Sequence, residues 1–96
     1  MSTKEAYKQK IEAELELAQA KLAKFKAQAK SSAADARIKY AKQVDELEQK
    51  VDVTKAKLKE LGEASDDAWE QLKDGVESAW ATLSAAIRNA AAKFKE

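Results

Sequence analysis

The chain has 96 residues, of which 36% are charged, and its 18 basic and 17 acidic side chains nearly cancel. It contains no histidine, no cysteine and no proline, and only two glycines, Gly62 and Gly75. The commonest general base, the thiol nucleophile and the usual zinc ligands are therefore missing. This composition predicts a protein that is not an enzyme and that uses neither a cofactor nor a metal ion.

A helical pattern runs through the first two-thirds of the chain. Apolar residues recur at steps of three and four, which is the spacing of a heptad repeat in a coiled coil. With few glycines, no proline and many Ala, Glu, Lys and Leu residues, the sequence predicts one all-α, coiled-coil or helical-bundle domain over residues 1–96. The repeat consists of Tyr7, Ile11, Leu15, Ala18, Leu22, Phe25, Ala29, Ser32, Ala36, Tyr40, Val44, Leu47, Val51, Thr54, Leu58 and Leu61.

Two architectures fit this repeat. The segment Lys30–Asp35 holds no glycine or proline, and serine costs a helix only about 0.5 kcal/mol, which favours one helix from about residue 3 to 61. A shorter helix, from about 65 to 95, would then return along it as a hairpin. However, two consecutive steps of four between Ala36 and Val44 shift the phase of the repeat. The alternative is therefore an up-down-up three-helix bundle with a turn near 30–35.

The end of the long helix and the returning helix have their own signals. Gly62 is expected at the left-handed position just past a helix end. Gly75 costs its helix about 1 kcal/mol relative to alanine, which predicts close approach of a bulky side chain such as Tyr40, Tyr7 or Phe25. The returning helix has a second apolar repeat, and its large side chains are predicted to anchor the hairpin: Trp69, Leu72, Val76, Trp80, Leu83, Ile87 and Phe94.

The hairpin predicts self-association. A helix of 59 residues would be about 88 Å long, so the shorter helix covers only half of it. The uncovered half leaves a stripe for association with a second copy, most simply as an antiparallel homodimer: Tyr7, Ile11, Leu15, Leu22 and Phe25. Residues 1–30 hold seven lysines against four glutamates, whereas 62–96 hold four basic against seven acidic side chains. This complementarity fits both architectures.

Other partners are judged from charge and hydrophobicity. Lysines alternate with glutamates and form no net basic surface, so we expect no binding to nucleic acid. No apolar run approaches the roughly 20 residues of a membrane span and no signal peptide is evident, which predicts a cytoplasmic protein. The apolar face of the last helix is also typical of helices that lie on membrane surfaces, although core packing is the favoured interpretation.

The segment from Ala64 to Trp80 resembles a known family. Its Ser-Asp-Asp-Ala-Trp start, with a second tryptophan eleven residues on, is similar to the C-terminal block of small bacterial coiled-coil stress-response proteins of the cyanobacterial type. Some members of that family are labelled apolipoprotein-like. The first 60 residues match only as a generic coiled coil. The resemblance implies a cytoplasmic bacterial protein linked to stress, and it carries over no catalytic residues.

These observations predict a non-enzymatic, self-associating coiled-coil protein that scaffolds or shields other proteins through helix–helix contacts. Two alternatives remain. One is an amphitropic protein whose last helix binds a membrane surface, and the other is a small accessory subunit of a larger complex.

Overall fold

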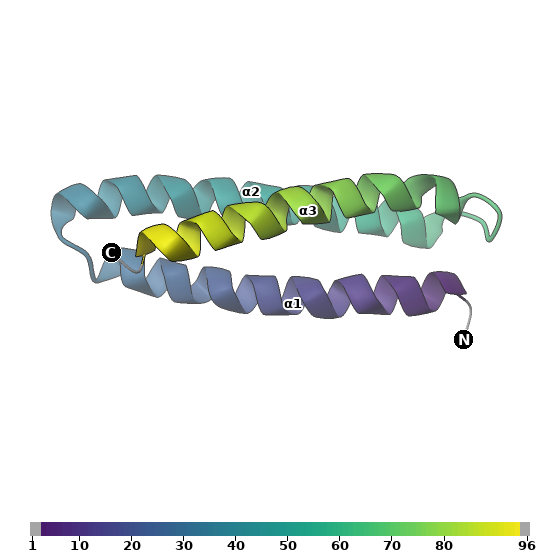
Figure 1. Ribbon diagram of the computed structural model, residues 1–96, viewed down its shortest axis with the longest axis horizontal. Coiled ribbons are helices and arrows are strands. Elements are labelled where there is room, and N and C mark those ends of the chain that lie inside the picture. Colours follow the sequence, from purple (N-terminus) through teal and green to yellow (C-terminus); the bar gives the residue numbers. More distant parts are fainter. Residues whose placement is uncertain (1–2, 95–96) are drawn as a thin grey trace.

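Within the part of the chain that the structure describes, three helices form a bundle in which the second helix runs antiparallel to the first and the third (Figure 1). The computed structural model describes residues 3–94, and within them α1 spans Thr3–Lys30, α2 spans Ala34–Glu63 and α3 spans Trp69–Phe94. The helices run up, down and up along one long axis, in a bundle of 51 × 19 × 18 Å (Figure 1). The prediction of an all-α fold is confirmed, and the three-helix alternative describes the arrangement.

The chain turns between α1 and α2, so the prediction of one helix from about 3 to 61 is wrong. Two serine hydroxyls lie at the end of α1: Ser31 Oγ and Ser32 Oγ both donate to the carbonyl oxygen of Gln28, at 3.0 and 2.8 Å. Ala33 is extended (φ −59°, ψ 155°), and α2 starts at the next residue. Such bonds also occur inside α2, at Thr54, and inside α3, at Thr82, so at Gln28 they cap a carbonyl group of the helix end rather than cause the break.

Packing explains why the turn is favoured over a continuous helix. Folding α2 back onto α1 buries the two halves of the apolar repeat against each other. Burial stabilises by about 1.5–3 kcal/mol for each large aliphatic side chain, whereas each lost helical hydrogen bond costs about 1 kcal/mol. The gain from several buried side chains therefore exceeds the cost of one break. The residues at the phase shift, Ser32, Ala36 and Tyr40, are only half-buried.

Residues 64–68 connect α2 to α3 without a left-handed glycine, so the position predicted for Gly62 is wrong. Gly62 lies inside α2, and within residues 3–94 no residue has a positive φ. Instead Lys4, from the start of α1, donates from Nζ to the carbonyl oxygen of Ala64 at 2.9 Å and that of Gly62 at 3.4 Å. A cation at the carbonyl end of a helix is favourable for the helix dipole, so the ammonium group does the capping.

The core lies along the axis where the three helices meet. The α3 side chains Trp69, Val76, Leu83 and Ile87 are buried in it, while Leu72 and Trp80 pack at its edge and are half-buried. The side chain of Phe94 lies outside the described residues. The contributions from α1 and α2 continue the repeat predicted from the sequence: Ile11, Leu15, Ala18, Leu22, Phe25, Ala29, Val44, Leu47, Val51, Thr54, Leu58 and Leu61.

Candidate interaction surfaces

Most of the predicted association stripe is not on the surface. Ile11, Leu15, Leu22 and Phe25 are buried in the core of a single chain, and Tyr7 is half-buried at its end. The stripe would have been exposed only if α2 had continued away from α1 as a rod. Because α2 and α3 cover it, these side chains give no reason to expect a second copy at this face, and any self-association must use other residues.

Two aromatic rings and two charged side chains form a cluster that connects the start of α1 with the start of α3. The ring of Tyr7 lies 5.9 Å from that of Trp69 between centroids, at a tilt of 40°. Lys73 Nζ lies 5.1 Å from the centroid of the Tyr7 ring, and the Tyr7 hydroxyl donates to Glu77 Oε1 at 3.4 Å. Burial raises the pKa of Tyr7 to about 12, and the negative charge of Glu77 contributes to the rise. Burial and the neighbouring carboxylate thus favour the neutral form of the phenol.

The raised pKa of Tyr7 predicts a loss of stability at alkaline pH. An unfolded tyrosine ionises near pH 10, so the stabilising contribution is complete below pH 10 and is lost as the pH rises through about 12. We expect the thermal midpoint of the native chain to fall more between pH 10 and 12 than that of Tyr7→Phe, measured by circular dichroism. Tyr40→Phe is the matched control, because it removes the same hydroxyl from a half-buried tyrosine of α2. Parallel profiles for the native chain and Tyr7→Phe would contradict the prediction.

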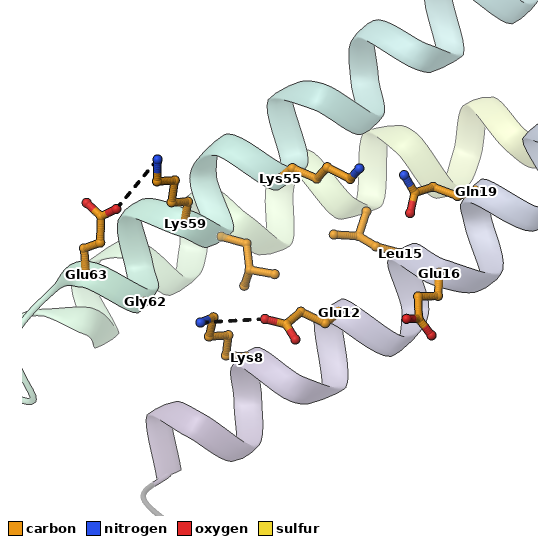
Figure 2. A pocket seen from close by; sticks show the side chains of 10 residues that line it. Lys8, Glu12, Leu15, Glu16, Gln19, Lys55, Lys59, Gly62 and Glu63 are labelled. Carbon is orange, nitrogen blue, oxygen red and sulfur yellow. Dashed lines mark ion pairs between the residues drawn. The ribbon is translucent and has the colours of Figure 1, made fainter.

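A charged groove lies between α1 and α2, on the side shown in Figure 2. It encloses about 470 Å³ and has Leu15 and Leu58 among its lining residues. The remaining lining combines Lys8, Glu12, Glu16 and Gln19 from α1 with Lys55, Lys59, Gly62 and Glu63 from α2. Gly62 leaves room for the Lys8 side chain, since a Cβ at that position would lie 3.2 Å from Lys8 Cε.

The chemistry of this groove is that of a solvated helix surface. Two of its three acids pair with lysines, with Lys8 Nζ 3.7 Å from Glu12 Oε1 and Lys59 Nζ 4.0 Å from Glu63 Oε1. Such exposed pairs contribute roughly 0–1 kcal/mol each. Throughout residues 3–94, no three acidic side chains come together as a metal-binding group.

A second groove, between α2 and α3, contains Gly75. The predicted close approach of Tyr40, Tyr7 or Phe25 to this glycine is wrong, because a Cβ at position 75 would meet only Lys57 Cδ, at 4.0 Å. The groove is lined by Ser78, Ala79 and Thr82 from α3 and by Gln49, Lys50, Val53 and Lys57 from α2, and Val53 is its one exposed large apolar side chain. Internal packing therefore does not explain why residue 75 is glycine.

The outer face of α1, on the side away from the core, carries an apolar repeat that was not predicted from the sequence. Leu17 is 69% exposed at its centre, next to the groove between α1 and α3 that Trp80 and Ile87 also line. All members of the repeat are exposed, and alanine recurs every seven residues: Ala6, Lys10, Ala13, Leu17, Ala20, Lys24 and Ala27. The signal is present in the sequence as a second pattern of three- and four-residue steps. It is hidden by the stronger repeat of Ile11, Leu15 and Leu22.

The chain was compared with known protein families, curated proteins and solved structures. No protein-family model, no curated protein and no solved structure matches the chain. Within the described part of the chain, none of the helices contains a stretch long and apolar enough to cross a membrane.

Proposed function

We propose that the protein is a non-enzymatic interaction protein that self-associates through helix–helix contacts. The observation that supports it most directly is that α1 carries repeats of three- and four-residue steps on two faces, the outer one made of alanines alternating with Lys10, Leu17 and Lys24. The inner one is buried against α2 and α3, and the outer one, centred on Leu17, is exposed. A helix at the surface of a monomer needs only one apolar face, because its other side is solvated.

The bundle suits a scaffold or shield rather than a catalyst. The chain holds no histidine or cysteine, and two of the three acids in the groove between α1 and α2 pair with neighbouring lysines. A rigid helical bundle with an exposed apolar repeat can hold another protein segment by side-chain packing alone. The resemblance of residues 64–80 to bacterial stress-response proteins supports a cytoplasmic role of this kind, in which the partner is a second copy, a client protein or a larger assembly.

Solution mass tests the proposal. We expect light scattering on a sizing column to give a mass near twice 10.6 kDa at the upper end of a hundredfold concentration range. Leu17→Glu should stay monomeric throughout, because it places a charge at the centre of the exposed repeat. Ile38→Glu is the matched control, since Ile38 is a similarly exposed aliphatic side chain (76%) on α2. A monomer across the whole range would contradict self-association.

One observation favours the membrane-surface alternative. Ten consecutive positions of α3, from Ser78 to Ile87, carry no charge, in a chain where 36% of the residues are charged. The bulky side chains of this segment face the core, and the exposed ones are small: Ser78, Ala81 and Thr82. Lipid binding would therefore require α3 to leave the bundle. A blue shift of tryptophan emission with anionic vesicles would favour this alternative, and unchanged emission would leave the protein-interaction role.

A further inference from the structure

We infer that the outer face of α1 is the docking surface for the same face of a second copy, with the two helices antiparallel. This inference rests on the proposed self-association and names the surface, the partner and the direction. The residues concerned, called here the outer repeat, are Ala6, Lys10, Ala13, Leu17, Ala20, Lys24 and Ala27.

The side-chain sizes of the outer repeat fit close packing of two helices. Its steps alternate between four and three, as in a coiled coil, and every second member is an alanine. When two such helices run antiparallel, each large member can lie opposite an alanine of the other copy. Leu17 then packs on the second copy's Ala20, and Lys24 lies over the second copy's Ala13. The aliphatic stem of a lysine can cover an alanine while its ammonium group stays in water.

The charged side chains of α1 favour a second copy as the partner and an antiparallel direction of the two helices. Glu14 and Lys21 lie on either side of Leu17 along the same edge of α1, where both line the groove towards α3. In the first half of α1 the three acids nearest its middle are Glu12, Glu14 and Glu16, whereas the second half holds lysines and no acid. An antiparallel pair brings Glu14 of each copy to Lys21 of the other. A parallel pair would instead place Lys10 and Lys24 each beside the same lysine of the second copy, and like charges are unfavourable at an interface.

The size of the contact predicts a weak dimer. One helix from each copy, packed mainly through alanines, provides less area than the roughly 1,200–2,000 Å² of stable complexes. We therefore expect the dimer to dissociate on dilution. Concentration dependence of the mass is part of the expected behaviour.

Cysteine cross-linking tests the direction and the register, because the native chain has no cysteine to interfere. Ala13→Cys and Lys24→Cys are prepared as separate variants at exposed positions and are treated with a mild thiol oxidant, alone and mixed. In the antiparallel pair, residue 13 of one copy lies beside residue 24 of the other. Two copies of residue 13 are then about 16 Å apart along the axis, too far for a disulfide. We expect a linked dimer in the mixture, which mass spectrometry identifies as containing one of each variant.

Controls and outcomes separate the inference from the proposed function. Ala56→Cys, at an exposed position on α2, measures linkage by random collision, and circular dichroism of each variant checks that it folds. Linkage of each variant with itself would mean a parallel pair and would overturn the inference. A doubled mass without linkage of residues 13 and 24 would also overturn it, but self-association would stand. A monomeric mass with no linkage above that of Ala56→Cys would overturn both.

Discussion

Replacing Trp69 by alanine is expected to lower the free energy of unfolding by about 3–5 kcal/mol, as large-to-small changes at buried aromatic residues do. Trp69 is 5% exposed at the first position of α3 and its ring packs on that of Tyr7 in α1. Its removal opens a cavity where two helices that are far apart in sequence begin. A domain of this size has about 5–15 kcal/mol of stability in total, so the loss should be large in relative terms.

Trp80→Ala is the matched control for Trp69→Ala. It deletes the same side chain from the same helix, but Trp80 is only half-buried and lines the groove between α1 and α3. We expect a smaller loss for Trp80→Ala, measured by urea unfolding followed by circular dichroism, since each change removes a fluorophore. Equal losses in the free energy of unfolding would contradict the difference in burial between Trp69 and Trp80.

The second large effect is expected for Ile87→Ala, at about 2–5 kcal/mol. Ile87 is 6% exposed and belongs to the half of α3 that reaches the turn between α1 and α2 (Figure 1). Its side chain packs in the core that all three helices share. The change therefore tests whether the second half of α3 is held as firmly as the first half, which Tyr7 and Trp69 connect to α1.

Ile38→Ala provides the comparison for Ile87→Ala. It is the same chemical change within α2, at a side chain that is 76% exposed, so little burial is lost and alanine has the higher helix propensity. We expect the free energy of unfolding to change by less than about 0.5 kcal/mol, as is usual for surface substitutions. A comparable loss in both variants would contradict the assignment of Ile87 to the core.

Much of the core was predictable from residue spacing alone. The members of the first repeat from Ile11 to Ala29 and from Val44 to Leu61 are the residues that α1 and α2 bury, and the α3 repeat supplies Trp69, Val76, Leu83 and Ile87. This works because a helix turns by 100° per residue, so steps of three and four place side chains on one face whatever that face contacts. Composition is equally direct, since a chain without histidine and cysteine cannot build the sites that need an imidazole or a thiol.

The two chain reversals were harder to predict. The first reversal contains no glycine or proline, the residues that usually mark a break. Its helix end is capped by the hydroxyl groups of Ser31 and Ser32, which both donate to the carbonyl oxygen of Gln28. At the second reversal, the ammonium group of Lys4 caps α2 at the carbonyl group of Ala64, which is 60 residues further along the chain. The sequence instead predicts that Gly62 ends this helix. Local sequence rules treat each helix end by itself. They cannot include a cap or a packing gain supplied by a distant segment.

The amino-acid sequence by itself determined that this protein is helical, which faces of its helices are apolar, and which catalytic groups it lacks. Only the tertiary structure decided what covers each face. The inner repeat of α1 is covered by α2 and α3 of the same chain, whereas the outer repeat around Leu17 stays exposed. The physical reason is that helix formation is set by neighbours three and four residues apart. The choice between a rod and a bundle instead depends on free energy from side chains that meet only after the chain has turned.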